Sequence, residues 1–198
     1  LMRTIPNMKV LCPADSFETK KTVAWLINHK GPAYLRLSRM PVEQICENTS
    51  FKFGEAAVMN SGDDACIIAC GLMVHKALLA AKKLEKFGIY ARVLNMSTIK
   101  PLDEKSIVKA ATETGCIVTV EEHNIIGGLG SAVSEVLSEQ YPTPMFRIGV
   151  RDIFGKSGNE EALLEKYGLT TEAIVDKVKE LYLTKMNLLA QKEAIIAR

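Results

Sequence analysis

Short apolar runs typical of β-strands alternate with helix-like segments along most of this chain. The strand-like runs lie at residues 65–69, 90–95, 116–121 and 145–149. Between the first two, residues 73–87 repeat apolar side chains at helical spacing. Strands separated by helices of this length favour a parallel sheet with right-handed crossovers. The sequence therefore predicts an α/β fold, with helices on both faces of a mostly parallel sheet.

Further helices are predicted in the second half of the chain. Asp103 is placed to cap a helix at residues 104–114, and residues 131–140 form another helix after a glycine-rich loop. Thr170 is placed to cap the last helix. Beyond Thr184 the apolar pattern loosens, so we expect the tail to be partly free of the fold.

The N-terminal segment predicts a smaller βαβ unit. Strand-like residues 9–12 precede Asp15 and Glu18, whose spacing is that of a capping box. A helix is expected at residues 16–28 and a second strand at residues 33–37. Such a unit has too few elements to cover its own sheet, so we expect it to belong to a larger domain or to pack against a partner.

The apolar residues of the N-terminal helix, Val23, Ala24 and Ile27, are expected on its buried side. Leu1 is not a natural start, and we expect further chain upstream of it. The predicted division has three parts: residues 1–48 as the end of an incomplete domain, residues 49–64 as a polar linker with an edge strand that could be antiparallel, and residues 65–198 as a three-layer αβα domain.

The charge and apolar pattern exclude some classes of partner. The formal net charge is +2, from 25 basic and 23 acidic residues, which is too small an excess to suggest nucleic acid. The longest apolar run is far shorter than the ~20 residues of a membrane span, and no signal segment opens the chain. We therefore expect neither nucleic acid nor a membrane as a partner.

The five cysteines form no Cys-x-x-Cys pair and no Cys/His ligand set, so we expect no metal site. Cys66 and Cys70 share one strand-like run, where they would be ~13 Å apart, too far to hold one metal ion. Cysteines scattered in apolar runs are typical of core thiols in a reducing compartment. The cytoplasm is the expected location.

A glycine-rich loop follows the third strand of the second unit, in VEEHNIIGGLGSAV. A dinucleotide fingerprint needs a third glycine where Val133 stands, and it follows the first strand of its unit. We therefore interpret Gly127 and Gly128 as a tight turn, and Gly130 as a close approach of helix and sheet. The alternative is that backbone N–H groups of this loop bind an anion.

His123 stands near the carboxyl end of a strand, after Glu121 and Glu122. Open α/β sheets bind ligands at such ends, and a Glu/His pair can move protons near neutral pH. A single histidine without a nucleophile or a metal set is more often structural. We keep His123 as a candidate beside the loop, with a structural role as the preferred interpretation.

Several stretches together resemble one family, the transketolases. They are LMRTIPNMKVLCPADSFET, GPAYLRLSR, IACGLMVHKALLAAKKL, VEEHNIIGGLGSAV and IGVRDIFGKSG followed by YGLTTEAI. They cover roughly residues 1–185 and occur in the family's order. The resemblance implies that residues 1–48 are the end of a pyrimidine-binding domain that serves thiamine diphosphate, and that the rest is the transketolase C-terminal domain.

The resemblance also implies the chemistry, which is the transfer of two-carbon ketol units between sugar phosphates by thiamine diphosphate. The family's cofactor-activating glutamate and its catalytic Asp/His motif lie upstream of the stretch that matches Leu1. We therefore expect no catalytic and no cofactor-binding residue in this chain. Thiamine diphosphate and Mg²⁺ would be held by other parts of the enzyme, and the chain alone would be inactive.

One functional residue carries over by its position in the motif. Arg39 matches the arginine with which family members hold the terminal phosphate of the sugar, and Ser38 beside it is a weaker candidate. A guanidinium suits this task because it offers a fork of donors to phosphate oxygens. The alternative is a surface arginine in an interdomain ion pair. Expected partners are an N-terminal transketolase part or subunit, a sugar phosphate and further copies in a homo-oligomer.

Three other readings remain open. Two are related thiamine diphosphate enzymes, deoxyxylulose-phosphate synthase and the β subunit of 2-oxo-acid dehydrogenases. The first tends to have His-Gly where this chain has Ser157-Gly158, and the second has no use for a sugar-phosphate arginine. The third reading is a non-catalytic assembly or anion-sensing module.

Overall fold

The computed structural model describes residues 1–196. Its larger sheet has five strands in the order β3-β5-β4-β7-β8. Strands β4, β5, β7 and β8 are parallel, and β3 pairs antiparallel with β5 at the edge. This confirms the predicted mostly parallel sheet with an antiparallel edge strand. The strands are β3 (Ala57–Asn60), β4 (Ala65–Ala69), β5 (Ala91–Asn95), β7 (Ile117–Asn124) and β8 (Met145–Val150).

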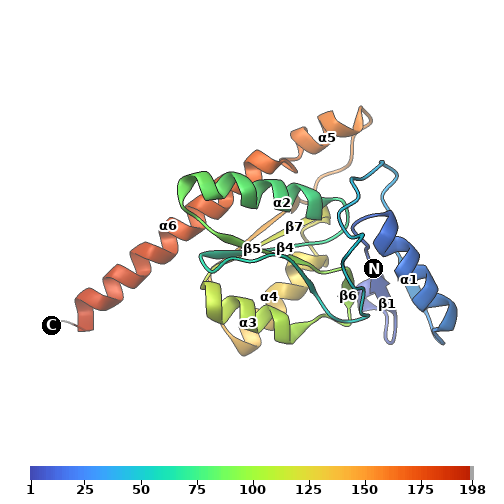
Figure 1. Cartoon of the computed structure of the whole chain (residues 1–198), viewed down its shortest axis with the longest axis horizontal. Coiled ribbons are helices and arrows are strands. Elements are labelled where there is room, and N and C mark those ends of the chain that lie inside the picture. Colours follow the sequence, from blue (N-terminus) through green and yellow to red (C-terminus); the bar gives the residue numbers. More distant parts are fainter. Residues whose placement is uncertain (197–198) are drawn as a thin grey trace.

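Helices cover both faces of this sheet and give the predicted three layers. Figure 1 shows α2 (Met73–Leu84) and α6 (Thr171–Ile196) on one face, with α3 (Glu104–Thr114) and α4 (Leu129–Gln140) on the other. A 3-10 turn at Glu85–Phe87 extends α2. The whole of β4 is buried, as expected for a strand between two parallel neighbours with helices above and below.

Alternation along β4 divides the core into two halves. Ile67 belongs to the half under α2 and α6, together with Met73 and Ile174. Ile68, the next residue, belongs to the half over α3 and α4, with Ile107. Successive side chains of a strand point to opposite faces, so one apolar run supplies both halves.

A second sheet of three strands joins the N-terminal unit to the rest of the chain. It consists of β1 (Lys9–Leu11), β2 (Ala33–Leu35) and β6 (Thr98–Lys100), in the order β2-β1-β6. Strands β1 and β2 are parallel, as predicted, and β6 is antiparallel to β1. The sequence did not predict β6, because it is only three residues long and pairs with a strand far away in the chain. The division into 1–48, 49–64 and 65–198 stays a prediction.

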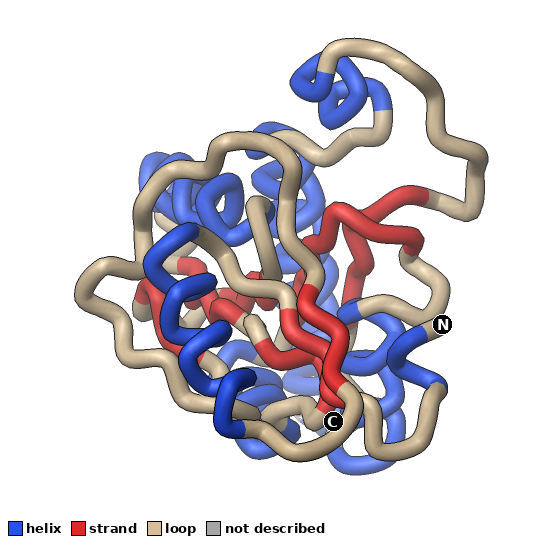
Figure 2. The backbone as a smooth tube through the Cα atoms, turned by 90° about the vertical axis from the view of Figure 1, so that its right-hand side faces the viewer, coloured by secondary structure: helices blue, strands red, loops and turns tan. Residues whose placement is uncertain are grey.

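Helix α1 (Ser16–Asn28) has the predicted bounds and cap but not the predicted buried side. Asp15 accepts a hydrogen bond from Glu18 N at 2.9 Å. The expectation that Val23, Ala24 and Ile27 are buried is wrong, since Ile27 is 77% exposed and the other two are also exposed. The residues of this helix that are buried against the rest of the chain are Glu18 and Thr22. Figure 2 shows the outer face of α1 with no element of residues 1–196 in front of it.

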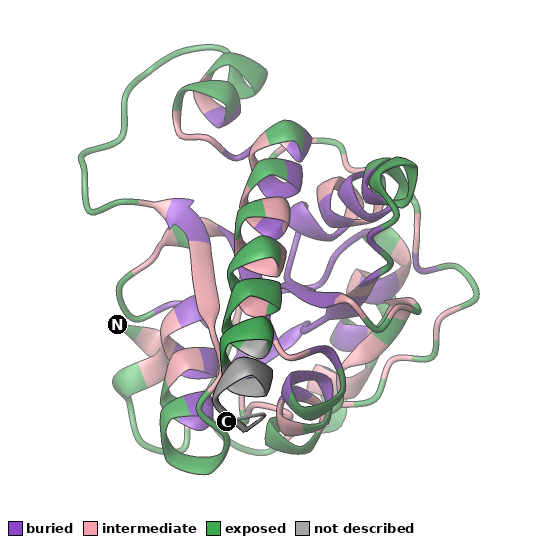
Figure 3. Ribbon diagram, turned by 90° about the vertical axis from the view of Figure 1, so that its left-hand side faces the viewer, coloured by how far each residue is buried: buried purple, intermediate pink, exposed green. Residues whose placement is uncertain are grey.

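The C-terminal region differs from expectation in two places. A short helix that was not predicted, α5 (Glu160–Lys166), is capped by Asn159. Helix α6 continues to Ile196 although its apolar pattern loosens beyond Thr184, and its end projects from the body (Figure 1). Figure 3 shows the buried side of α6 against the sheet and its exposed side outward. Within residues 1–196, no helix combines the length and the apolar character that a membrane span needs.

Candidate functional site

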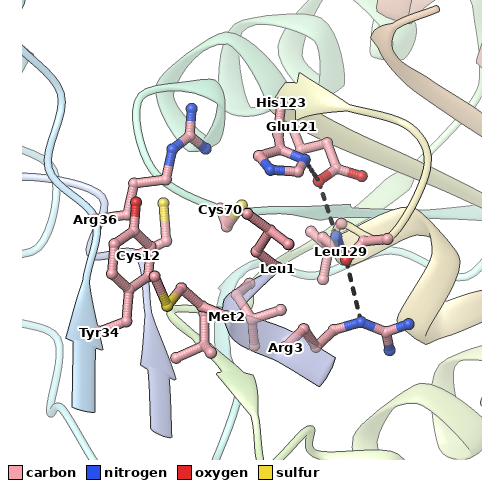
Figure 4. A pocket seen from close by; sticks show the side chains of 14 residues that line it. Leu1, Met2, Arg3, Cys12, Tyr34, Arg36, Cys70, Glu121, His123 and Leu129 are labelled. Carbon is pink, nitrogen blue, oxygen red and sulfur yellow. Dashed lines mark hydrogen bonds and ion pairs between the residues drawn. The ribbon is translucent and has the colours of Figure 1, made fainter. Parts of the chain in front are cut away.

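A cavity of about 350 Å³ lies between the small sheet and the glycine-rich loop (Figure 4). Its walls include the carboxyl ends of β4 and β7, where parallel α/β sheets usually hold their ligands. A 3-10 turn near the N-terminus, η1 (Met2–Thr4), closes one side. The lining residues are Leu1, Met2, Arg3, Val10, Cys12, Tyr34, Arg36, Cys70, Ile99, Glu121, His123, Gly127, Gly128 and Leu129.

Glu121 is a buried carboxylate beside this cavity, near the end of β7. Its two oxygens accept hydrogen bonds from Leu129 N and Gly130 N, both at 2.8 Å. These are backbone N–H groups of the first turn of α4, which have no partner within the helix. Glu121 therefore caps α4 from the neighbouring strand, where its charge also meets the positive end of the helix dipole.

The glycines of the loop are explained by this cap and by the helix that follows. Gly127 has φ +75, a conformation that L side chains rarely adopt. A Cβ on Gly128 would collide with the Glu121 carboxylate. A Cβ on Gly130 would lie 2.7 Å from Thr119 Oγ1, so this glycine allows α4 to approach the sheet. Two of the N–H groups that could bind an anion here are already bonded to Glu121.

Burial raises the pKa of Glu121, and the two backbone N–H groups, His123 and Arg36 act in the opposite direction. His123 Nδ1 lies 2.7 Å from the carbonyl oxygen of Asn124 and 3.8 Å from Glu121 Oε2. A carbonyl oxygen only accepts, so Nδ1 is the nitrogen that bears hydrogen and Nε2 is the one that can take up a proton. The arrangement places a Glu/His pair at the cavity wall, with the glutamate also bound to α4.

Arg3 fixes the loop from the opposite side of the cavity. Its Nε donates to the Gly127 carbonyl oxygen at 3.1 Å, and its two terminal nitrogens donate to the Glu135 carboxylate at 2.9 and 2.5 Å. The last two bonds form the bidentate fork that arginine makes with carboxylates. The turn η1 is thus attached to both the glycine-rich loop and α4.

The predicted phosphate-binding residues lie outside this cavity. Arg39 and Ser38 are exposed, just beyond the end of β2. Ser38 Oγ accepts a hydrogen bond from Met40 N at 3.1 Å. Ser38 and Met40, which flank Arg39 in the chain, both line an open hollow of about 530 Å³ that Lys20 also lines. The structure therefore brings together His123, Gly127 and Gly128, with Gly130 close by, but keeps Ser38 and Arg39 apart from them.

Two arginines line the cavity, Arg3 and Arg36, and the sequence singled out neither as a site residue. The guanidinium of Arg36 donates to the Glu122 carbonyl oxygen and lies 3.7 Å from Glu122 Oε2. The sequence did indicate that Arg36 shares a face with Tyr34. The two are two residues apart, and side chains two positions apart along a strand point to the same face. Both line the cavity.

The residues of this chain do not by themselves fit thiamine diphosphate. The cofactor would need a glutamate at its aminopyrimidine ring, and among the residues whose side chains the structure describes the buried glutamates are Glu18 and Glu121. Glu18 accepts from Ala14 N at 2.6 Å and from Asn95 Nδ2 at 3.0 Å, and Glu121 is bonded to α4. Both carboxylates are committed to the fold. The described part of the chain also has no cluster of three or more His, Cys, Asp or Glu that could hold a metal ion.

Two protein-family models match the chain. The model described as "Transketolase, pyrimidine binding domain" matches residues 1–44. The model described as "Transketolase, C-terminal domain" matches residues 54–174, which include all five strands of the large sheet.

Comparison with individual proteins gives the same family. The 6-deoxy-6-sulfo-D-fructose transketolase subunit SqwH of Clostridium sp. (strain MSTE9) is 45% identical over 181 residues, which are 91% of this chain and 56% of the relative. The 1-deoxy-D-xylulose-5-phosphate synthase of Caldanaerobacter subterraneus subsp. tengcongensis is 34% identical over 184 residues, 91% of this chain but 30% of the synthase.

A solved structure described as "Split gene transketolase, inactive beta4 tetramer" superimposes with a TM-score of 0.89 and 47% identity. The match covers 93% of this chain and 61% of that chain. This chain thus spans little more than half the length of the transketolase subunit that it matches, and 61% of the chain in the solved structure.

Proposed function

This chain belongs to the transketolase family, and on that basis we propose that it supplies the C-terminal part of an enzyme transferring two-carbon ketol units between sugar phosphates. The observation that most strongly supports the proposal is the likeness to the split-gene transketolase, with a TM-score of 0.89 and 47% identity. The order of the two matched domains, pyrimidine-binding before C-terminal, is also that of the family.

In this proposal, a separate N-terminal part or subunit holds thiamine diphosphate and Mg²⁺. The proposal is supported by the commitment of Glu18 and Glu121 to hydrogen bonds within the fold, which leaves neither carboxylate for the cofactor. The related tetramer is described as inactive. By analogy, residues 1–198 alone do not turn over substrate.

The first task of this chain is packing. The outer face of α1 exposes Val23 and Ile27, and an apolar face of this kind is suited to contact with the rest of a pyrimidine-binding domain. The C-terminal domain then contributes to a homo-oligomer whose active sites form where the parts meet. The cytoplasm remains the proposed location.

The second task is to bind the phosphate group of the sugar through Arg39, with Ser38 as a weaker contributor. The surroundings of Arg39 suit an anion, because its chain neighbours Ser38 and Met40 line an open hollow with Lys20, and Ser38 and Lys20 supply a hydroxyl and a positive charge there. An arginine fork gives two parallel hydrogen bonds to phosphate oxygens. Arg39 is exposed in this chain, and the substrate channel would be completed by the N-terminal part.

The second candidate is deoxyxylulose-phosphate synthase, because one such enzyme is 34% identical to this chain. Two observations favour the transketolase reaction. The transketolase subunit is more similar, at 45% identity, and Ser157 stands where the synthases tend to have histidine. The two reactions use different donors, a ketose phosphate for the first and pyruvate for the second.

Reconstitution tests the proposal. The chain is mixed with the polypeptide that supplies the N-terminal part, and ketol transfer is assayed for each component and for the mixture. We expect activity in the mixture only, with a ketose phosphate as donor. Activity with pyruvate as donor and none with ketoses would favour the synthase. A mixture that forms a complex but transfers no ketol unit would refute the proposal.

A further inference from the structure

Two cysteines from different sheets face each other across the cavity wall. Cys12 follows β1 of the small sheet, and Cys70 follows β4 of the large sheet. Both thiols are buried from bulk solvent, and both side chains line the cavity (Figure 4). The residues are 58 positions apart in the chain, so nothing in the local sequence pairs them.

The backbones beside these thiols are in direct contact. Gly71 N, the amide that follows Cys70, donates to the Cys12 carbonyl oxygen at 3.2 Å. A Cβ on Gly71 would lie 2.9 Å from Cys12 Sγ, so the Cys12 sulfur packs against the backbone next to Cys70. A disulfide requires Cα atoms close together, about 4.4–6.8 Å apart. The two contacts hold the chain at Cys12 directly beside the chain at Cys70, as such a bond needs.

The other cysteines lack this arrangement. Cys66 N donates to the Cys116 carbonyl oxygen at 3.0 Å, yet the two side chains enter opposite halves of the core. Cys46 lies in the same half as Cys116, but at the opposite end of the sheet. Cys46 Sγ lies 3.9 Å from Asn95 Nδ2 at the carboxyl end of β5, whereas Cys116 Sγ lies 3.5 Å from the Asp64 carbonyl oxygen, just before β4. Cys66 shares a half with Cys12 and Cys70 but stands at the far end of β4, four residues before Cys70. The five thiols therefore contain one facing pair.

The surroundings make the two thiols chemically unequal. A hydrogen bond from the Cys70 thiol lowers the pKa of Cys12, and the positive charge of Arg36 lowers it further. Burial and the negative charges of Glu122 and Glu18 act in the opposite direction, but the net shift of this pKa is downward. The same hydrogen bond, with burial, raises the pKa of Cys70. Cys12 is thus the better source of thiolate, which is the reactive form, and Cys70 is the thiol that stays protonated beside it.

We propose that Cys12 and Cys70 are a redox modification site, which a peroxide oxidises to an intramolecular disulfide that ties the small sheet to the large one. The Cys12 thiolate attacks a peroxide oxygen, the O–O bond breaks, and Cys12 becomes a sulfenic acid while one water leaves after protonation. The Cys70 sulfur then attacks the Cys12 sulfur, and the sulfenic oxygen leaves as a second water. Two thiols are oxidised and one peroxide is reduced to two waters.

The bond has a structural consequence. It joins β1 to the end of β4 at the wall that also contains Arg36 and Glu121, and so restrains the N-terminal unit against the αβα domain. A cross-link between residues so far apart removes much freedom from the unfolded chain. Dithiol reductants reverse it by thiol–disulfide exchange.

The test treats the folded, fully reduced chain with hydrogen peroxide, followed by alkylation of the remaining thiols after unfolding. We expect the mass before alkylation to fall by about 2 Da, the mass of the two lost hydrogens. Three of the five thiols should then alkylate. Peptide mapping should show a linked pair of peptides that contain Cys12 and Cys70, and the oxidised chain should melt at a higher temperature than the reduced one.

Matched variants separate this pair from the other thiols. Cys12→Ser and Cys70→Ser should each abolish the linked peptides, while Cys66→Ser should leave them unchanged. If a serine variant does not fold, the peptide map of the wild-type chain still decides the question. Oxidation of Cys12 to a sulfinic acid without a link to Cys70, five alkylatable thiols after peroxide, or links only between chains would each overturn the proposal.

Discussion

The carboxylate of Glu121 occupies the space that a side chain on Gly128 would need. The same carboxylate accepts hydrogen bonds from Leu129 N and Gly130 N, so the glycine and the glutamate form one structural unit that starts α4. A loop that looks like a phosphate cradle in the sequence is thus a joint in which the protein provides its own anion. Substitutions at Gly128 and Gly127 test this relationship directly.

Gly128→Ala should destabilise the chain strongly. The new methyl group forces the Glu121 carboxylate away from the two amides that it caps, or shifts the start of α4. We expect a loss of about 2–4 kcal/mol in the free energy of unfolding, measured by chemical denaturation.

Gly127→Ala is the matched control, because position 127 has a positive φ but nothing within 4 Å of a Cβ. Its cost is backbone strain alone, about 1 kcal/mol. Equal losses for the two variants would show that the Glu121 carboxylate does not enforce glycine at position 128.

The titration of Glu121 should be visible in the pH dependence of stability. Its pKa is raised in the folded chain, above the ordinary value of 4.5, so the folded state binds this proton more tightly than the unfolded state. The stability that the proton contributes is fully present below the ordinary value and is lost as pH rises through the raised value. As pH rises from the ordinary to the raised pKa, we expect the free energy of unfolding of the wild type to fall relative to that of Glu121→Gln. Denaturation curves recorded at successive pH values measure this difference.

His123 lies 3.8 Å from the Glu121 carboxylate and needs its own control. In His123→Asn the neighbouring imidazole is absent while Glu121 and its two backbone partners remain. The free energy of unfolding of His123→Asn should fall, over the same pH interval, relative to that of the double variant that also contains Glu121→Gln. Parallel stability profiles for wild type and Glu121→Gln would contradict the raised pKa.

Asp15 should be far more important than an ordinary helix cap. One of its oxygens accepts from Glu18 N at 2.9 Å, and the other accepts from Ile45 N and Cys46 N, each at 2.7 Å. Asp15→Ala leaves three amides without their acceptor in a buried site. We expect a loss of about 3 kcal/mol or more in the free energy of unfolding.

Asn159→Ala is the comparison for Asp15. Asn159 caps α5 by accepting from Glu161 N at 3.0 Å, but its surroundings are exposed to water. Its removal should cost about 1 kcal/mol, because water replaces the lost acceptor. If both substitutions cost the same in denaturation curves, Asp15 is a simple cap and does not anchor residues 45 and 46.

Arg39→Ala in the reconstituted enzyme should discriminate between donors. We expect phosphorylated donors to lose about 2–4 kcal/mol of transition-state stabilisation, because a charge-assisted contact to a partly buried phosphate is removed. Donors without phosphate should be unaffected in kcat/KM. Arg39→Lys, which keeps the charge without the fork, should show an intermediate loss. Equal losses for both kinds of donor would refute the assignment of Arg39 to the phosphate.

Local features of the fold could be predicted from the sequence. Asp15 and Asp103 cap the helices that their spacing indicates, and the apolar run at β4 is a strand buried on both faces. These features depend on residues close together in the chain. The alternation of strands and helices then limits the topology to a parallel sheet covered on both sides.

Features that depend on distant residues could not be predicted. Strand β6 is defined by its pairing with β1, nearly 90 residues earlier in the chain. The facing of Cys12 and Cys70 arises from the same meeting of the two sheets. The pattern of α1 indicated which of its sides is apolar, but not whether anything within the chain covers Ile27. To predict that Glu121 caps α4, one would have to know where α4 begins relative to β7.

The central claim is that this chain provides the C-terminal part of a transketolase whose cofactor site is completed elsewhere. Titration calorimetry with thiamine diphosphate and Mg²⁺ tests it most directly, on residues 1–198 alone and on their complex with the N-terminal part. The account predicts no binding in the micromolar range by the chain alone and clear binding by the complex. Micromolar binding by the isolated chain would contradict it.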